Sequence, residues 1–322
     1  LRGHADRYLS GEEISQRLGV SRTAVWKHIH QLEAAGYRIA AVPHLGYRLL
    51  DTPDLLIPDE IQAGLRTRRF GRPCASYRET GSTNDRALEW AVRGAPECAL
   101  VAAEHQTQGR GRNGRTWTSR ARANLLVSLV LRPGWPLERA PLLTLLAAAG
   151  VARGVEAVAS LDTTIQWPID IFVGEAKVAG ILTEIQAQGD KIVHAVLGIG
   201  VNVNAAPAGA QRLRAASLAG LRGGPVVRLS VLRAVLEALE ALYDRAQREG
   251  AGAILAAWRE RDALRGQLVR VECARGGPLE GTAMGVDENG ALLLRLDGGQ
   301  VDRLPGGDVD RLRPAGTAGG VT

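Results

Sequence analysis

The stretch Gly109-Arg110-Gly111-Arg112-Asn113-Gly114-Arg115-Thr116-Trp117 alternates arginine with glycine directly after an apolar, strand-like run at residues 99–103. Glycine lets the backbone turn tightly and approach a ligand closely, and arginine presents forked donors that match a carboxylate or a phosphate. The stretch therefore predicts a loop that wraps a small anion. A solvated basic loop or an RGG-like RNA-binding segment is the alternative interpretation.

The composition is that of an ordinary globular protein, with 45 % hydrophobic and 23 % charged residues in a chain of 322. This length is enough for two or three domains. A net charge of +6 permits an anionic partner but does not identify one. The cysteines, Cys74, Cys98 and Cys273, have no metal-ligand spacing, so neither a disulfide framework nor a zinc site is expected. No uninterrupted apolar run is long enough for a membrane span, and a cytoplasmic location fits these features.

The first fifty residues predict a helix, a tight turn, a second helix and a hairpin. Ser10 and Glu13 have the spacing of a capping box, Gly19 ends the first helix, and Ser21 caps the second. Strands are expected at 37–42 and 47–50. This order of elements is typical of a winged helix-turn-helix.

The second of these helices predicts a DNA-binding surface. Residues 1–50 contain seven Lys or Arg against four Asp or Glu, and this excess of positive charge suits a polyanionic partner. A small helical packing module is the alternative. The candidate DNA-contacting residues, which point away from the apolar face or lie at the helix start, are Arg22, Thr23, Trp26, Lys27 and His30.

The remaining chain predicts an α+β multidomain protein in which helices and strands mix and a small β-barrel follows. Strands are expected at 123–130, 165–173, 178–185 and 192–203, and helices at 141–158, 229–247 and 253–261. Shorter strands at 267–273, 279–286, 291–296 and 300–304, separated by glycine-rich turns, predict the barrel. We expect domains at 1–52, 58–264 and 265–315, and a disordered tail at 316–322.

Short polar motifs accompany the basic loop in the sequence. Each has an ordinary structural explanation, such as a helix cap at Ser82, a solvated charge at Lys177 or a bulge at Gly200. Their joint occurrence in this order is far more specific than any one of them. The motifs are Ser82-Thr83-Asn84, Gln106, residues 177–184 (KVAGILTE) and residues 198–204 (GIGVNVN).

With these motifs and Trp167-Pro168 near Asp170, the chain resembles the bifunctional biotin protein ligases, also called biotin–[acetyl-CoA-carboxylase] ligases and biotin operon repressors. The resemblance covers nearly the whole chain. It implies a winged helix-turn-helix, a class II synthetase-like α/β catalytic domain with a mixed sheet, and an SH3-like C-terminal barrel.

The resemblance also implies the reaction. Biotin and ATP give biotinyl-5′-AMP and pyrophosphate, and biotin then passes to a lysine on the biotin carboxyl carrier domain of a carboxylase. Joining two anions requires concentrated positive charge and positioning more than a protein nucleophile. No protein metal site is expected, and Mg²⁺ would be carried by ATP. Operator DNA, and a second copy of the chain when biotinyl-AMP is bound, are the other implied partners, with no membrane partner.

Residue roles follow from the same resemblance. Catalysis is assigned to Lys177, Arg112 and Asp170, with Lys177 stabilising charge and Asp170 orienting or deprotonating the acceptor lysine. The implied biotin contacts are Ser82, Thr83, Asn84, Gln106, Arg110, Gly111, Arg112, Lys177 and Gly180. The implied nucleotide contacts are Arg115, Trp117, Asn202 and Arg313.

Two residues depart from the family pattern. The family usually has Lys-Trp-Pro-Asn-Asp where this chain has Gln166-Trp167-Pro168-Ile169-Asp170. A cation is lost at Gln166, and a donor and an acceptor are lost at Ile169, which in a buried polar site would cost about 1–3 kcal/mol. A biotin-sensing repressor with weak or lost ligase activity is therefore the alternative to an active ligase. A lipoate ligase would share the central fold, but the basic loop argues against it.

Overall fold

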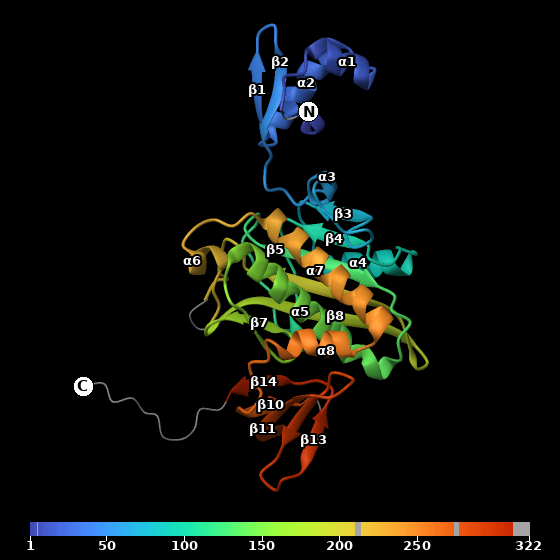
Figure 1. Ribbon diagram of the computed structural model, residues 1–322, viewed down its shortest axis with the longest axis vertical. Coiled ribbons are helices and arrows are strands. Elements are labelled where there is room, and N and C mark those ends of the chain that lie inside the picture. Colours follow the sequence, from blue (N-terminus) through green and yellow to red (C-terminus); the bar gives the residue numbers. More distant parts are fainter. Residues whose placement is uncertain (5, 210–213, 274–276, 312–322) are drawn as a thin grey trace, which may run out of the picture. The chain divides into compact units, whose positions relative to one another are not determined.

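The computed structural model describes residues 1–4, 6–209, 214–273 and 277–311, and the chain divides into two units at Asp54 (Figure 1). The first unit, Leu1–Asp54, contains two helices followed by a hairpin of two antiparallel strands. The expected helix-turn-helix and hairpin are therefore present. Its elements are η1 (Arg2–His4), α1 (Gly11–Leu18), α2 (Arg22–Ala34), β1 (Arg38–Val42) and β2 (Gly46–Asp51).

Both helix starts in this unit are capped as the sequence predicts, with one correction. The hydroxyls of Ser10 and Ser21 accept hydrogen bonds from backbone amides three residues later. The reciprocal half of the predicted capping box is absent, because the Glu13 carboxylate pairs instead with Arg7 at 2.7 Å and Arg17 at 2.9 Å. Charge-assisted bonds to guanidinium groups are stronger than a single bond to a neutral amide. A small core including Ile14, Val25 and Ile29 holds the helices together.

The second unit is built on a seven-stranded sheet with the order β3-β4-β5-β9-β8-β7-β6. The β3–β4 pair is parallel and the other neighbours are antiparallel, which confirms the expected mixed sheet. The strands are β3 (Cys74–Tyr77), β4 (Leu100–Ala103), β5 (Leu125–Leu131), β6 (Thr164–Gln166), β7 (Asp170–Val173), β8 (Ala176–Gln188) and β9 (Lys191–Val201).

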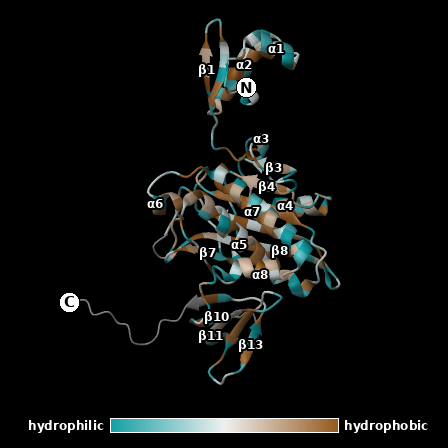
Figure 2. Ribbon diagram, in the orientation of Figure 1, coloured by the Kyte–Doolittle hydropathy of each residue, from teal (hydrophilic) through white to brown (hydrophobic). Residues whose placement is uncertain are grey.

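Helices cover this sheet, and α5 and α7 form its main packing layer (Figure 1). Hydrophobic residues recur along α7 among hydrophilic ones, as expected for a helix with one buried side (Figure 2). At Gly154 of α5, an added Cβ would lie 2.7 Å from the backbone of Val235, so glycine permits the close approach of α7. The helices are α3 (Pro58–Gln62), α4 (Thr83–Val92), η2 (Arg112–Gly114), η3 (Leu137–Arg139), α5 (Ala140–Ala159), α6 (Leu218–Arg222), α7 (Arg228–Glu249) and α8 (Gly252–Arg259).

The segment Leu137–Ala159 is long and apolar enough to cross a membrane, although the sequence was expected to contain no such run. Within this structure, 72 % of its most apolar window is buried inside the protein. Burial against the sheet and α7 explains the apolar composition, so we interpret α5 as the core helix of a globular domain.

An antiparallel five-stranded sheet follows, with the order β13-β12-β11-β10-β14. Its buried side chains, such as Val271 and Leu294, belong to the same apolar core as the central sheet. The two sheets therefore pack as one unit. The strands are β10 (Leu268–Glu272), β11 (Pro278–Val286), β12 (Leu292–Arg295), β13 (Val301–Leu304) and β14 (Asp308–Arg311).

The sequence-based prediction was wrong or incomplete at several elements. The strand expected at 165–173 is two strands, because Trp167-Pro168, joined by a cis peptide bond, lies between β6 and β7. Proline has no N–H to donate, so it does not continue the ladder. Strands β3 and β14 and the short helices α3 and α6 were not predicted. The tail expected to be disordered, 316–322, lies outside the described residues.

Candidate active site

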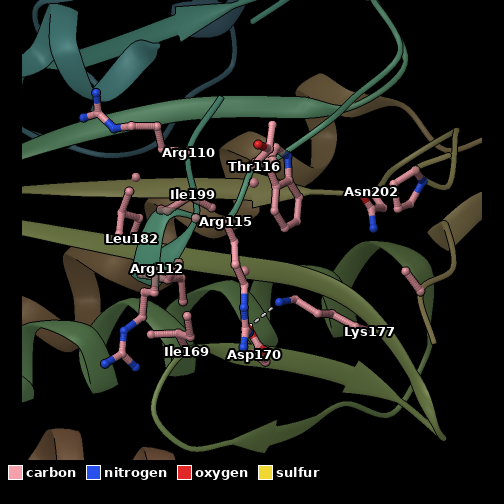
Figure 3. A pocket seen from close by; sticks show the side chains of 18 of the residues that line it. Arg110, Arg112, Arg115, Thr116, Ile169, Asp170, Lys177, Leu182, Ile199 and Asn202 are labelled. Atoms are coloured by element: carbon pink, nitrogen blue, oxygen red, sulfur yellow. Dashed lines mark ion pairs between the residues drawn. The ribbon is translucent and has the colours of Figure 1, made fainter. Parts of the chain in front are cut away.

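A cavity of about 720 Å³ lies between the basic loop, the start of α4, the central sheet and β14. It is the place where the predicted biotin, nucleotide and catalytic residues meet (Figure 3). Arg313 lies outside the described residues. The predicted residues that line the cavity are Ser82, Thr83, Asn84, Gln106, Arg110, Gly111, Arg112, Arg115, Trp117, Asp170, Lys177, Gly180 and Asn202.

A network of neutral polar groups forms one end of the cavity. The Gln106 amide oxygen accepts from the Thr83 hydroxyl at 2.8 Å and from its backbone N–H at 2.7 Å. The Ser128 hydroxyl contacts the Thr83 hydroxyl at 2.8 Å and donates to the Asn84 amide oxygen at 2.6 Å. Ser82 caps α4 by accepting from the Asn84 N–H. Because these groups are bonded to one another and all but Gln106 are buried, the end of the cavity is rigid.

Charged groups continue this network outward. The Asn84 amide donates to Glu184 at 2.6 Å, and Arg110 contacts Glu184 at 3.1 Å and Asp85 at 2.5 Å. Burial alone would lower the pKa of the Arg110 guanidinium, but these two carboxylates outweigh it and raise the pKa. Arg110 is thus a positively charged group held at the outer end of the network by two carboxylates.

Two glycines on β9 make room for cavity side chains. A Cβ added to Gly198 would lie 2.2 Å from the Asn84 amide oxygen, and one added to Gly200 would lie 2.5 Å from the Trp117 indole. Both distances are shorter than any real carbon contact. The glycines of the 198–204 motif are therefore required for packing inside the cavity.

Lys177 and Asp170 point toward each other across the β7–β8 pair (Figure 3). The Lys177 ammonium lies 2.6 Å from an Asp170 carboxylate oxygen and 5.9 Å from the centre of the Trp117 ring. The two charged side chains remain partly exposed, at 25 % and 22 %. This ammonium is therefore held in place but remains accessible to an anion in the cavity.

The basic loop is folded on itself and bound to β14. Arg112 donates to the Gly307 carbonyl at 3.0 Å, and Asp308 accepts from Asn113 at 2.9 Å and pairs with Arg115 at 2.9 Å. Burial lowers the pKa of the Arg112 guanidinium, while the carboxylates of Asp308 and Asp170 act in the opposite direction. A desolvated guanidinium next to open space is a favourable anion-binding group.

The segment with the two departures lies where the central sheet meets the C-terminal sheet. Gln166 donates to the Val309 carbonyl at 2.8 Å, and the Trp167 indole donates to the Gly290 carbonyl at 3.2 Å. Ile169 lines the cavity and packs partly on the core. Gln166 thus bonds the C-terminal sheet, and Ile169 presents an alkyl group to the cavity.

Three buried polar atoms in the cavity wall have no hydrogen-bond partner among the described residues. One is an Asp170 carboxylate oxygen, which is ion-paired with Lys177. The other two are the indole N–H of Trp117 and the side-chain oxygen of Asn202, one a donor and the other an acceptor. Buried polar groups are nearly always bonded, so these two atoms fit a polar ligand. Over the same residues, no group of three or more His, Cys, Asp or Glu could hold a metal ion.

Three residues that bond to the predicted site residues were themselves not predicted from the sequence, and of these only Asp308 lines the cavity. Ser128 lies inside the apolar strand β5, Glu184 on β8 and Asp308 on β14, each far along the chain from its partner. Only the register of the sheets brings them to Asn84, Arg110 and Arg115, so no local pattern could have identified them.

The candidate DNA-contacting side chains lie on or at the start of α2, and all five are exposed. The Trp26 and His30 rings make an edge contact with centres 4.1 Å apart, and His30 also contacts Glu33 at 2.7 Å. A half-exposed tryptophan on a small helical unit is available to a partner.

Comparisons with known proteins agree with this architecture. Three family models match: an HTH domain at 1–48, the Biotin/lipoate A/B protein ligase family at 77–202, and a Biotin protein ligase C terminal domain at 266–312. The chain is 39 % identical to the bifunctional ligase/repressor BirA of Bacillus subtilis over 297 residues, 91 % of both chains.

Other relatives and a solved structure give the same result. The biotin–[acetyl-CoA-carboxylase] ligase of Mycobacterium tuberculosis is 36 % identical over 256 residues, which are 76 % of this chain and 93 % of that protein. The structure of a biotin protein ligase from Aquifex aeolicus in complex with biotin and ATP superposes with a TM-score of 0.63 at 26 % identity. It covers 75 % of this chain and 99 % of that chain.

Proposed function

The chain belongs to the biotin protein ligase family, and on that basis we propose which of its residues bind biotin, bind ATP and bind DNA. Members include bifunctional ligase/repressors that match it along nearly their whole length. The ligase activity uses biotin and ATP, and the helix-turn-helix domain belongs to the repressor role. One observation carries the proposal: the cations and polar groups expected from the sequence meet in a single cavity.

Biotin is assigned to the rigid end of the cavity. Thr83, Asn84 and Gln106 offer hydrogen-bonding groups there, and Ser82 and Gly180 line the same space. A few fixed polar groups in a confined site give specificity for a small ligand. Arg110 and Gly111 border this end through the basic loop.

ATP is assigned to the other end of the cavity, which is lined by Trp117, Asn202 and Arg115. These residues fit a nucleotide. The unbonded indole N–H of Trp117 and amide oxygen of Asn202 offer a donor and an acceptor, and Arg115 offers a cation. When bound, ATP supplies the α-phosphorus that the biotin carboxylate attacks, with pyrophosphate leaving. Arg313 is proposed as a further nucleotide contact from the family resemblance alone.

The chemical step is assigned to electrostatic stabilisation by two cations. Lys177 and Arg112 stabilise the negative charge that the carboxylate and the phosphate bring together. The Lys177 ammonium is held by Asp170 at 2.6 Å. In the transfer step we assign Asp170 to orient the acceptor lysine of the carrier domain and to accept its proton. The amine then attacks the biotinyl carbonyl, the anhydride bond breaks and AMP leaves.

DNA binding is assigned to the exposed side of α2, with the β1–β2 hairpin as the wing of a winged helix-turn-helix. Arg22, Thr23 and Lys27 offer donors to phosphates and base edges, with Trp26 and His30 beside them. With DNA from upstream of the chain's own gene, a mobility shift should weaken in Lys27→Ala. An unchanged shift would instead favour a packing module.

The wider organisation is proposed from the same resemblance. We assign domains to 1–52, 58–264 and 265–315, the last as an SH3-like barrel. We also propose a homodimer when biotinyl-AMP is bound, with a carboxyl carrier domain as acceptor. We also propose a cytoplasmic location, which the three free cysteines support.

Biotin-dependent release of pyrophosphate from ATP tests the site assignment, with lipoate as the matched control substrate. Release with biotin but not lipoate, and its loss in Lys177→Ala, would support the assignment. Equal release with both acids would contradict the biotin assignment of Thr83, Asn84 and Gln106.

A biotin-sensing repressor with weak or lost ligase activity is a second candidate. The observation that favours it is Ile169, whose alkyl side chain offers no hydrogen bond at the cavity wall. This candidate predicts tight biotin binding without pyrophosphate release, and release restored in Ile169→Asn. Release by the unmodified chain would contradict it.

A further inference from the structure

A buried polar cluster lies next to the cavity and takes no part in the chemistry assigned above. It consists of the backbone N–H of Leu56 and the side chains of Glu104, Asn124 and Arg228. These four residues are 0 %, 6 %, 1 % and 2 % exposed. We call these four residues the hub. Glu104 and Arg228 form an ion pair at 2.6 Å, and the Arg228 guanidinium also donates to the Asn124 carbonyl at 3.4 Å.

The hub binds the point where the chain enters the second unit. The first unit ends at Asp54, so Leu56 is the second residue beyond it. The Leu56 backbone N–H donates to the Glu104 carboxylate at 2.8 Å, and its side chain is fully buried in the main core. The linker from the helix-turn-helix unit is therefore fastened to a buried carboxylate.

The hub also binds both ends of the segment that carries the basic loop. Glu104 directly precedes residues 105–123, and Asn124 directly follows them. The two ends are joined again by the Arg122 N–H, which donates to the Glu104 carbonyl at 2.9 Å. Gln106, a cavity-lining residue, is only two positions from Glu104.

The hub also binds the start of a second segment that lines the cavity, the one that follows β9. The Asn124 side-chain oxygen accepts from the N–H groups of Val203 and Ala205 at 3.0 and 3.2 Å. The segment that follows β9 includes Asn202, Pro207 and Arg214, which line the cavity. Both segments around the ligands and the linker thus share one set of buried hydrogen bonds.

We propose that the hub positions both cavity segments and couples their order to the linker of the helix-turn-helix unit. A buried ion pair that loses one contact leaves a charge uncompensated, so its contacts form and break together. A ligand that orders the basic loop therefore reduces opening of the hub and of Leu56. Glu104 and Arg228 are positioning residues, and the inference rests on the proposed binding of biotin and ATP in the cavity.

Because coupling between two sites is reciprocal, the proposal also predicts how a change in the linker affects ligand binding. If ligand binding tightens the linker, then loosening the linker must weaken ligand binding by the same factor. Such couplings are typically about fivefold or more. Leu56→Ala removes a side chain that anchors the linker but leaves the Glu104–Arg228 pair intact. It should therefore weaken biotin binding in the presence of ATP by about fivefold.

Backbone hydrogen exchange of the full chain tests the coupling directly. Two peptides are followed with and without biotin plus ATP and Mg²⁺: residues 105–124, which report ligand binding, and residues 52–57, which report the linker. In the unmodified chain both should exchange more slowly with ligand. In Leu56→Ala, residues 105–124 should still slow while residues 52–57 should not.

Matched variants separate coupling from general destabilisation. Ile61→Ala also truncates a fully buried side chain close by, but on α3 and outside the hub, so its linker should respond as in the unmodified chain. Glu104→Gln keeps an acceptor oxygen for the Leu56 N–H but removes the charge. It should raise KM for biotin or ATP at least fivefold with less than a twofold change in kcat.

The outcomes distinguish failure of the proposed coupling from failure of the proposed ligand site. If residues 105–124 slow but residues 52–57 do not, the coupling is wrong while ligand binding stands. If neither segment slows, the proposed ligand site is wrong and the inference falls with it. A linker response in Leu56→Ala equal to that of the unmodified chain, or one lost equally in Ile61→Ala, would also overturn the coupling.

Discussion

The two ends of the cavity differ in how complete they are without ligand. At the biotin end, Thr83, Asn84 and Gln106 are bonded to one another and to Ser128. At the nucleotide end, two buried polar atoms have no partner among the described residues, and Arg115 is bound to Asp308. One end is preformed, whereas the other must exchange its contacts for those of a ligand. This difference predicts that biotin binding precedes productive nucleotide binding.

Lys177→Ala should have the largest effect, because its ammonium lies where the two ends meet. Removing one preorganised charge from such a site typically lowers kcat by about 10²–10³-fold. Pyrophosphate release with saturating biotin and ATP measures the loss. Lys191→Ala, an exposed lysine on β9, is the matched control and should retain full activity. A loss of less than fivefold in Lys177→Ala would remove Lys177 from the mechanism.

Gly198→Ala should damage the biotin end selectively. Its Cβ would lie 2.2 Å from the Asn84 amide oxygen, so the network must move. Overpacking of this kind costs about 1–3 kcal/mol, and biotin binding should weaken about tenfold or more. Calorimetric titration and thermal unfolding measure both effects. Gly252→Ala, where nothing lies within 4 Å, is the control. Unchanged biotin affinity in Gly198→Ala would show that the end is not rigid.

Ile169→Asn should improve the nucleotide end alone. A new hydrogen-bonding group in the cavity is worth about 0.5–1.5 kcal/mol, so KM for ATP should fall by roughly two- to tenfold. Biotin affinity should stay constant. Ile169→Val, which adds no polar group, is the control for a change in volume. An effect on biotin binding equal to that on ATP would contradict the separation of the two ends.

Asp308→Asn should have the smallest effect. The side chain keeps its size but loses the charge that pairs with the exposed Arg115. Because the Arg115 side chain is 69 % exposed, solvent screens the pair and its contribution is about 0.2–1 kcal/mol. Tryptic cleavage within 109–117 in the absence of ligand should therefore accelerate at most about fivefold. Asp297→Asn, at an exposed turn, is the control. Unchanged cleavage would mean that β14 does not hold the loop.

Much of this architecture could be predicted from local patterns. The caps at Ser10 and Ser21, the Ala- and Leu-rich composition of α5, the periodicity of α7 and the turns of the C-terminal sheet are encoded by neighbouring residues. Elements whose stability comes from distant partners were missed. Strand β14 has no apolar alternation of its own and is specified by pairing with β10. Helix α3 was missed because it has only five residues and no side-chain cap.

The candidate site followed the same division. The residues of the motifs line one cavity as expected, from the start of α4, the basic loop and strands β8 and β9. Their partners were not predictable, since only sheet register brings Ser128, Glu184 and Asp308 to the motif residues. The hub shows this most clearly. Glu104 and Arg228 are 124 positions apart, and neither lies in a motif.

Calorimetric titration of the full chain with each ligand alone, and with ATP after saturation by biotin, tests the difference between the two ends most directly. We predict that biotin binds without nucleotide, and that ATP binds at least tenfold more tightly once biotin is present. ATP binding equally well with and without biotin, together with biotin binding that requires ATP, would contradict a preformed biotin end.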